Sequence, residues 1–289
     1  MAEQVSQGQV LGGRFELTEP FAEDPLLEVW LAEDLELRRD VVIKLLLPRW
    51  MEDEEMVERF RFESLAAAQL LHENIARTYD VETSAGRLYA VTEYVPGPTV
   101  ATLMEGAPLA PVVVAALIQQ AAKGLASMHD EGLAHAAVTP HNLLVAPNGR
   151  LCIVDFGSTR LIGQRLDHPE PVFPEPGASD YWSPERLGGA TPDDRSDVYA
   201  LGLLAWEALT GTREVATTTP QRPMRRLLAS LPGGDDVTPR LRELLLEATA
   251  DDPDRRPTAR EFAEALAEIC GERPQEHLEP LVADFEVAD

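Results

Sequence analysis

Hydrophobic and polar residues follow short β-type patterns over the first hundred residues of the chain. Residues 14–17, 26–32 and 40–47 alternate or are rich in β-branched side chains, with polar turns between them. A period of two residues is typical of strands with one buried face, so the pattern predicts three successive β-strands. Residues 88–95 form a more continuous apolar run, which predicts a buried strand ending at a Pro-Gly-Pro hinge.

Residues 48–71 show helical spacing instead, and their acidic start favours a helix N-terminus. The apolar positions of the predicted inward stripe are Met56, Phe60, Ala67 and Leu70. Glu63 falls on the same stripe, and a carboxylate on a buried face needs a cation beside it. The alternative is that Glu63 lies on the surface.

Helical patterns dominate the second half of the chain. Residues 111–129 and 198–210 are apolar on nearly all sides, which predicts two core helices. Thr258 and Glu261 have the spacing of a capping box before a final helix. The richest apolar run, 109–118, is shorter than the roughly 18 residues that a membrane span requires, so we expect no membrane span.

A hairpin is predicted where two apolar runs, 143–146 and 151–154, flank an Asn-Gly pair, the strongest short-range signal for a two-residue turn. Pairing the residues on either side of Asn-Gly and counting outward places Asn142 opposite Asp155, with side chains roughly 5 Å apart. Amide and carboxylate oxygens suit a Mg²⁺ ion shared with a phosphate. The alternative is that both residues merely end their strands.

The excess of acidic residues limits the classes of binding partner that we expect for this chain. Fifty acidic residues against 25 basic ones give a net charge of −25 in 289 residues, of which 44% are hydrophobic. This argues against nucleic acid and anionic membranes and for a globular protein that attracts basic partners, unless the acidity serves only solubility. Two cysteines offer no disulfide framework and the N-terminus has no apolar signal region, so we expect a cytoplasmic protein.

The stretch from Leu133 to Gly157 carries a resemblance to a known family. His135-x-x-x-x-Pro140-x-Asn142, followed by an Asp-Phe-Gly sequence at 155–157, resembles the catalytic loop and DFG motif of the protein kinases, in particular the Hanks-type bacterial serine/threonine kinases. The resemblance implies an α+β, bilobal kinase-like fold with a small β-rich N-lobe and a larger, mostly helical C-lobe. The implied divisions are an N-terminal extension at 1–13, a kinase-like domain at 14–270 with its N-lobe at 14–95 and C-lobe at 96–270, and a loosely packed acidic tail at 271–289.

The same resemblance implies a nucleotide site. Lys44 ends a Val-Val-Ile-Lys strand and would pair with Glu63, while Asn142 and Asp155 would bind the metal. The implied nucleotide-binding residues are Lys44, Glu63, Thr92, Glu93, Val95, Asn142 and Asp155. Thr92 would be the gatekeeper, and the backbones of the two residues after it in that set would meet the edge of adenine.

Three catalytic-loop positions depart from the family pattern, which reads H-R-D-x-K-P-x-N. Ala136, Ala137 and Thr139 stand where the family has the Arg, the general-base Asp and the Lys. Because Ala137 occupies the base position, we assign no catalytic residue. Where the family has its glycine-rich loop, this chain has F-A-E-D-P-L-L-E-V at residues 21–29, without any of the three glycines, so we expect the grip on phosphates to be weak.

Other landmarks of the family are intact. Glu185 and Arg256 resemble the ion pair that ties the large lobe together. Asp197 resembles the residue that holds the catalytic-loop backbone, the alternative being a helix cap. Residues 157–185 resemble an activation segment, but without the family's Arg at position 136 we expect no switching by phosphorylation there.

These features indicate a pseudokinase that acts as a scaffold or allosteric module and binds ATP and Mg²⁺ weakly. The expected partners are proteins, such as another kinase or a phosphopeptide-binding domain. One alternative is a slow or atypical serine/threonine kinase that uses ATP. The other is that no nucleotide binds and Lys44 and Glu63 form only a structural strut.

Overall fold

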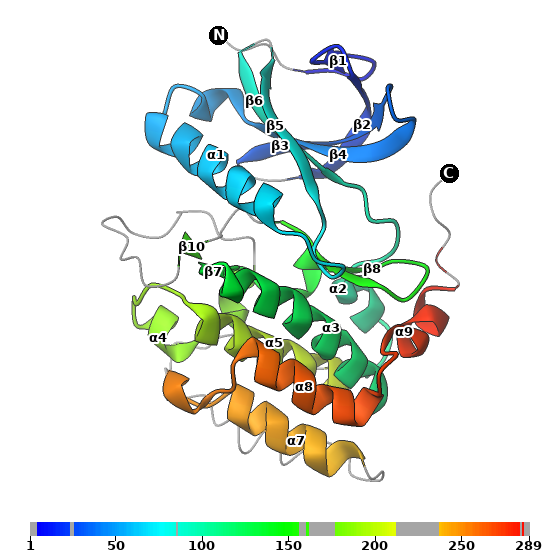
Figure 1. Cartoon of the computed structure of the whole chain (residues 1–289), viewed down its shortest axis with the longest axis vertical. Helices are drawn as coiled ribbons and strands as arrows, with labels where there is room; N and C mark the ends of the chain where they lie inside the picture. The colour runs from blue at the N-terminus through cyan, green and yellow to red at the C-terminus, as the bar shows by residue number, and fades with distance from the viewer. Residues whose placement is uncertain are drawn as a thin grey trace. The chain divides into compact units, whose positions relative to one another are not determined.

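The computed structural model describes residues 5–23, 26–84, 86–155, 160–161, 177–211, 237–283 and 285. The chain divides into two compact units (Figure 1). The first comprises Met1–Leu71 and Ile75–Tyr94, and the second His72–Asn74 and Val95–Asp289. The main division therefore falls next to the predicted hinge, while three residues of the first half of the chain belong to the second unit.

A six-stranded sheet forms the first unit, in the order β1-β2-β3-β4-β6-β5, with antiparallel neighbours throughout. The strands are β1 (Val10–Leu11), β2 (Phe15–Glu23), β3 (Leu27–Asp34), β4 (Arg39–Leu46), β5 (Thr78–Ser84) and β6 (Arg87–Glu93). The four predicted strands correspond to β2, β3, β4 and β6. The sequence pattern does not reveal β1, which has two residues, or β5, an edge strand without a fully buried position.

The two faces of this sheet pack against different partners. Alternate residues of β4, starting at Val41, belong to a core cluster on one face. On the other face Leu46 packs against Phe60 of helix α1 (Glu54–Gln69), which lies beside the sheet in Figure 1. Val5 and Leu11 are buried in the first cluster, so the predicted N-terminal extension contributes to the core of this unit.

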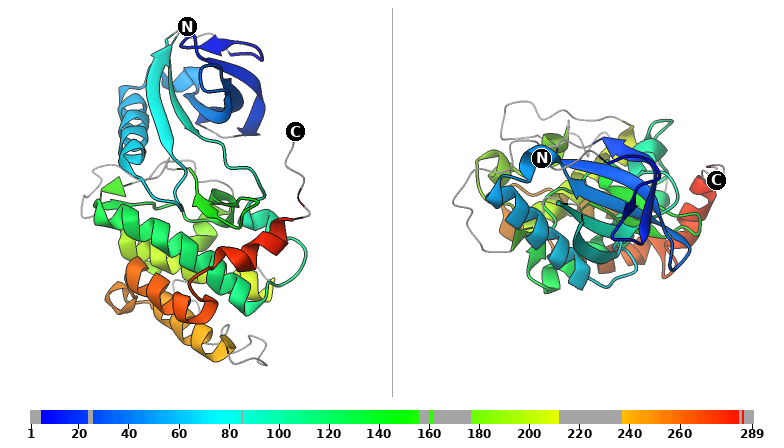
Figure 2. Two further views of the ribbon diagram at one scale, coloured as in Figure 1. Left: turned by 45° about the vertical axis from the view of Figure 1, so that its right-hand side comes forward. Right: turned by 90° about the horizontal axis from the view of Figure 1, so that it is seen from above.

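Helices make up most of the second unit. They are α2 (Val100–Met104), α3 (Pro111–Asp130), α4 (Pro184–Leu187), α5 (Asp194–Thr210), α7 (Val237–Ala248), α8 (Ala259–Cys270) and α9 (Gln275–Val282). α3 packs against α5 and α8 (Figure 2). Among the described helices α3 alone is long and apolar enough to cross a membrane, and 72% of that stretch is buried inside the protein. That burial is typical of a core helix, which the sequence predicted here.

The prediction of a loosely packed C-terminal tail is wrong for α9. Leu278 and Val282 of this helix are buried, with 0% and 3% of their surfaces exposed. α9 packs on α3, which gives its two buried side chains a partner. The acidic composition of the tail led to the wrong prediction. Two apolar residues four apart are nevertheless enough to bury one face of a short helix.

The predicted two-residue turn between β8 (Leu143–Val145) and β9 (Leu151–Ile153) is wrong by one residue. The Ala146 N–H donates to the Arg150 carbonyl, which leaves a three-residue loop. Gly149 takes a left-handed φ of 72°, and the Asn148 side chain accepts the Arg150 N–H. A type I turn followed by a left-handed glycine is the usual form of three-residue hairpin loops, and Asn-Gly satisfies it as well as the shorter turn.

The longer loop shifts the register at the open end of the hairpin. Asn142 lies opposite Val154, whose N–H donates to the Asn142 carbonyl at 3.0 Å. Asp155 is therefore one residue beyond the predicted position, and its own φ of 64° turns the chain at that point. The predicted metal ligands remain neighbours along the hairpin, but they are not a cross-strand pair.

Replacing Gly149 should expose how tightly α9 and the hairpin fit together. A Cβ at this position would lie 2.1 Å from the Gln275 carbonyl oxygen, and the backbone is left-handed. Gly132 has nearly the same φ, 73°, with nothing within 4 Å of a Cβ, so Gly132→Ala measures the backbone strain alone. We expect Gly149→Ala to lower the free energy of unfolding by about 1–3 kcal/mol more than Gly132→Ala. Urea denaturation measures both, and equal losses would contradict the close contact.

Candidate functional site

Asp197 holds the backbone of the catalytic loop from α5. Its carboxylate accepts the N–H groups of His135 and Ala136, each at 2.8 Å, and lies 2.9 Å from Nε2 of His129. Burial raises the pKa of Asp197, but the hydrogen bond and charge of His129, with the charge of His135, outweigh it and hold the pKa below its ordinary value. This carboxylate is therefore charged when it grips the loop.

The helix-cap alternative for Asp197 is wrong. α5 begins after Asp193, whose side chain forms a capping box with Ser196. Asp197 lies inside the helix, with 1% of its surface exposed. The role implied by the family resemblance is confirmed by the geometry.

The three altered loop positions lie on this held backbone. Ala136 takes a left-handed φ of 61°. Ala137 accepts a hydrogen bond at its carbonyl from Nδ2 of Asn142, at 3.0 Å. Thr139 is 3% exposed, and its hydroxyl finds no hydrogen-bond partner among the described residues. The loop therefore keeps its backbone arrangement, while the side chains of base and Lys are absent from it.

Asn142 and Asp155 are the predicted ligands of a metal ion shared with phosphates, and their binding of a metal stays a prediction. Because the amide nitrogen of Asn142 donates to Ala137, its Oδ1 is left as a hard oxygen ligand, and Asp155 supplies a carboxylate. Among the described residues no group of three or more His, Cys, Asp or Glu side chains could hold a metal by itself. Phe156 and Gly157 of the motif lie outside the described residues.

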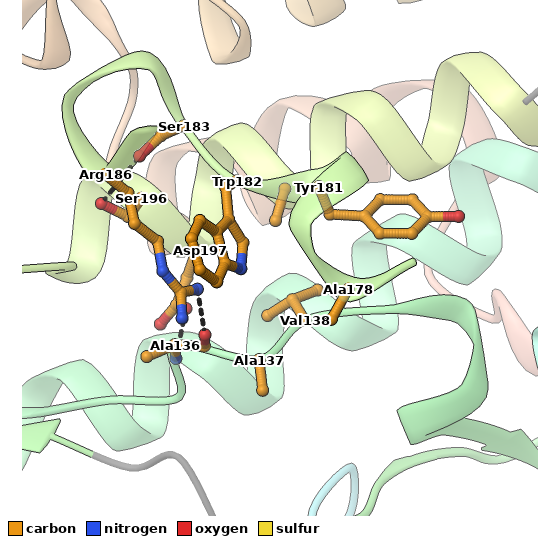
Figure 3. Close-up of a pocket in the computed structure, with 11 residues that line it drawn as sticks. Ala136, Ala137, Val138, Ala178, Tyr181, Trp182, Ser183, Arg186, Ser196 and Asp197 are labelled. Carbon is orange, nitrogen blue, oxygen red and sulfur yellow. Dashed lines mark hydrogen bonds between the residues drawn. The ribbon is translucent and has the colours of Figure 1, made fainter. Parts of the chain in front are cut away.

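A hollow separates the catalytic loop from residues 178–186 (Figure 3). Ala136 and Ala137 line it on the loop side, and Trp182 lines it on the other. Arg186 crosses it: the guanidinium donates to the Ala136 carbonyl and lies 4.1 Å from the centroid of the Trp182 ring. Of the predicted activation segment, the structure places residues 160–161 and 177–185, because residues 157–159 and 162–176 lie outside the described residues.

The predicted ion pair of the second unit is confirmed. Arg256 donates to both carboxylate oxygens of Glu185, at 2.7 and 2.8 Å, and its side chain is fully buried. Ser196 donates to the same carboxylate at 3.0 Å. Burial raises the pKa of Glu185, but the hydrogen bonds from Arg256 and Ser183 outweigh it and lower the pKa to about 2.

Lys44 lies on the face of the sheet that α1 covers. It pairs with Ala90 in the register of β4 and β6, and Leu46 follows two residues later on the same face. Leu46 and Ala90 belong to the same core cluster as Phe60 of α1. The Lys44 side chain therefore extends from the sheet on the α1 side, as a partner of a carboxylate on α1 must.

Glu63 lies on the buried side of α1, with 6% of its surface exposed, so the surface alternative is wrong. Nε of Arg59 donates to Oε1 of Glu63 at 2.7 Å, one helical turn away. Pairing of Glu63 with Lys44 stays a prediction, which the shared face of the sheet supports.

The predicted adenine contacts lie at the end of β6 and just after it. The Thr92 hydroxyl donates to the Val42 carbonyl at 3.4 Å. Glu93 donates its N–H to the Arg77 carbonyl at 2.8 Å and accepts the Arg77 N–H at its side chain. Val95 is buried, and it is the first residue of the longer segment of the second unit. Their contact with a nucleotide stays a prediction.

Sequence reasoning missed Arg186, His129 and Arg59. The Arg59–Glu63 pair has an ordinary signal, opposite charges four residues apart on a helix. Arg186 and His129 contact residues that are 50 and 68 positions away in the sequence, and no local sequence pattern predicts such pairs.

Comparison with known proteins agrees with this geometry. The family described as Protein kinase domain matches residues 28–266. The chain belongs to the protein kinase family. Among the relatives of this kinase domain, the serine/threonine-protein kinase PrkC of Bacillus subtilis is 31% identical over 265 residues, which cover 89% of this chain and 40% of PrkC. Serine/threonine-protein kinase PknB of Mycolicibacterium smegmatis is 35% identical over 258 residues, covering 86% and 41%.

A solved kinase domain shares the fold. The crystal structure of the Mycobacterium tuberculosis PknI kinase domain has a TM-score of 0.70 and 28% sequence identity, covering 92% of this chain and 99% of that one. The predicted kinase fold, with a β-rich N-lobe sheet and a helical C-lobe, is confirmed. The chain spans about two-fifths of the length of PrkC and PknB.

Proposed function

We propose that this kinase domain acts as a pseudokinase, a binding module that scaffolds or regulates a protein partner without efficient phosphoryl transfer. The observation that carries the proposal is Ala137 at the base position, with Thr139 in place of the loop Lys, on a backbone that Asp197 holds in order. A positioned general base contributes about 10²–10⁴ in rate, or roughly 3–5 kcal/mol of barrier. That contribution is forfeited here.

A second candidate is a serine/threonine kinase that uses ATP slowly or atypically. The comparisons favour it over the pseudokinase, because PrkC and PknB are named serine/threonine kinases. The family's metal-binding Asn142 and Asp155 and its strand Lys44 are also present. Phosphoryl transfer depends heavily on positioning, so losing the base lowers the rate without abolishing it.

In both candidates the nucleotide would be ATP with Mg²⁺. Lys44 would contact its phosphates, and Asn142 and Asp155 would hold the metal, which neutralises phosphate charge when bound. The affinity is expected to be weak, because residues 21–26 contain no glycine and two acidic residues. Residues 21–23 end strand β2, and Asp24 and Pro25 lie outside the described residues.

The partner in this proposal is a protein, either another kinase or a phosphopeptide-binding domain, acting in the cytoplasm. The net charge of −25 supports a partner with a basic docking surface. The two cysteines are free and buried, which suits a reducing compartment.

A phosphoryl-transfer assay separates the two candidates. We expect purified protein with γ-labelled ATP and Mg²⁺ or Mn²⁺ to label neither itself nor a serine/threonine peptide above the level of a protein-free control. Label that appears with the unaltered chain and disappears in Asp155→Ala would instead establish the slow kinase, since a contaminating enzyme would not respond to this substitution.

Nucleotide binding should appear as a thermal shift. A ligand that binds only the folded state stabilises it by RT ln(1 + [L]/Kd), about 1.4 kcal/mol at ten times Kd. We expect millimolar ATP with Mg²⁺ to raise the melting temperature of the unaltered chain and of Lys123→Met, but not of Lys44→Met. These are the only two lysines in the sequence, so the pair is matched. No shift in any of the three would favour the structural strut.

A further inference from the structure

Arg186 connects two segments of the second unit that are far apart in the sequence. It belongs to α4, near the end of the predicted activation segment, and its guanidinium points at the catalytic loop (Figure 3). The Ala136 carbonyl accepts a hydrogen bond from it, and the Trp182 ring lies beneath it at 4.1 Å. A guanidinium that is both hydrogen-bonded and stacked on an indole is fixed in orientation as well as position.

The loop residue that Arg186 contacts is held on both of its polar groups. The N–H of Ala136 donates to Asp197 of α5, and its carbonyl accepts from Arg186 of α4. Ala136 itself has a left-handed φ of 61°, a conformation that residues other than glycine adopt mainly where the surroundings enforce it. The two hydrogen bonds, one with Arg186 of α4 and one with Asp197 of α5, together hold Ala136 in this conformation.

We propose that Arg186 is a positioning residue that locks residues 177–187 to the catalytic loop without phosphorylation. Order in such a segment is often created by a phosphate that pairs with an Arg. Here position 136 of the loop is Ala, the cation comes from the segment itself, and the acceptor is a main-chain carbonyl. A carbonyl needs no modification to accept a hydrogen bond, so the junction is permanent and not switched.

The lock also fixes the shape of the hollow in Figure 3. Ala137 and Val138 line it from the loop, and Ala178 and Trp182 line it from the segment. Because Arg186 bridges these two walls, the hollow keeps one form whether or not the segment is phosphorylated. The inference does not depend on the proposed function, since a slow kinase and a pseudokinase would both contain the same lock.

Hydrogen exchange of the unphosphorylated protein tests the lock. We expect Arg186→Gln to speed exchange of the amides at residues 135–138 at least tenfold and to leave the amides of α8 unchanged. Arg186→Lys, which keeps a charged donor but not the planar stack, should lie between. Arg260→Gln is the matched control, because this exposed Arg pairs only with the exposed Asp130 among the ion pairs of the described residues. It should leave residues 135–138 as they are.

Two results would overturn the inference. If the amide exchange rates at residues 135–138 of Arg186→Gln stay within twofold of those of the unaltered chain, Arg186 does not stabilise the loop. Lower protection at these residues in the phosphatase-treated unaltered chain than in the chain as purified would mean that a phosphate, not Arg186, makes the junction. If α8 amides show that Arg186→Gln unfolds, Trp182→Leu replaces it: removal of the ring should speed the same loop amides at least threefold, and no change would reject the lock.

Discussion

A chain carrying both Ala137→Asp and Thr139→Lys is expected to transfer phosphoryl groups from ATP to a serine/threonine peptide about 10²–10⁴ times faster than the unaltered chain. The new Asp restores a base that accepts the proton of the substrate hydroxyl, and the new Lys restores a cation beside the transferring phosphoryl. Transfer of label from γ-labelled ATP to the peptide measures the gain.

The structure supports a large effect because the loop backbone is already in place. Asp197 holds the N–H groups of His135 and Ala136, and Asn142 donates to the carbonyl of Ala137. Ala137 also lines the hollow of Figure 3, so a longer side chain at this position would extend into that hollow. We also expect the glycine-free sequence at residues 21–26 to bind phosphates weakly, which places the expected gain near the lower end of the range.

Ala137→Asn with Thr139→Met is the matched control, with side chains of similar size but without base or cation. It should stay at the level of the unaltered chain. A doubly restored chain that binds ATP in the thermal-shift assay but gains less than tenfold would show that the missing base is not what limits this protein, and it would remove the main support of the pseudokinase proposal.

Arg256→Ala is expected to lower the free energy of unfolding by about 3 kcal/mol at neutral pH. Breaking a buried ion pair from one side typically costs about 3–5 kcal/mol, because the remaining charge is left without compensation. Glu185 keeps 20% of its side-chain surface exposed, which favours the lower figure. Arg256 also donates to the carbonyls of Ala250 and Arg195, and these would lose a partner in a buried environment.

The loss should depend on pH in a defined direction. The pKa of Glu185 falls from 4.5 to about 2 in the folded protein, so its charge contributes stability that is present above pH 4.5 and is lost as the pH falls toward 2. Arg256→Ala removes a main cause of the depressed pKa. We therefore expect the difference in unfolding free energy between the two chains to shrink from pH 7 to pH 3.

Arg260→Ala provides the control for this measurement. Its partner Asp130 is about as exposed as Arg260 itself, and exposed pairs contribute about 0–1 kcal/mol. Urea denaturation at both pH values should show a large, pH-dependent loss for Arg256→Ala and a small one for Arg260→Ala. Losses of equal size would mean that the Glu185–Arg256 pair does not tie the second unit together.

The hairpin shows where sequence reasoning reached its limit. Asn-Gly between apolar runs correctly predicted β8, β9 and a tight connection, because turn residues act locally on the backbone. Two-residue and three-residue loops both accept Asn-Gly, so the sequence left a one-residue uncertainty. That uncertainty decides whether Asn142 faces Asp155 or Val154.

The tail and the strand β5 show a related limit. α9 is acidic and short, and its order depends on packing against α3. β5 is an edge strand without fully buried residues, and its place depends on pairing with β6. Each segment has too few apolar residues for a clear periodic pattern, so it is recognised only together with the neighbouring element.

The sequence by itself determined the family, the order of the main strands and helices, and the absence of a base and a Lys from the catalytic loop, because these follow from local periodicity and from the identity of residues at motif positions. Only the tertiary structure decided which groups hold that loop. Asp197 and Arg186 reach it from α5 and α4, at sequence separations that no local pattern encodes, since such contacts are set by how the helices pack.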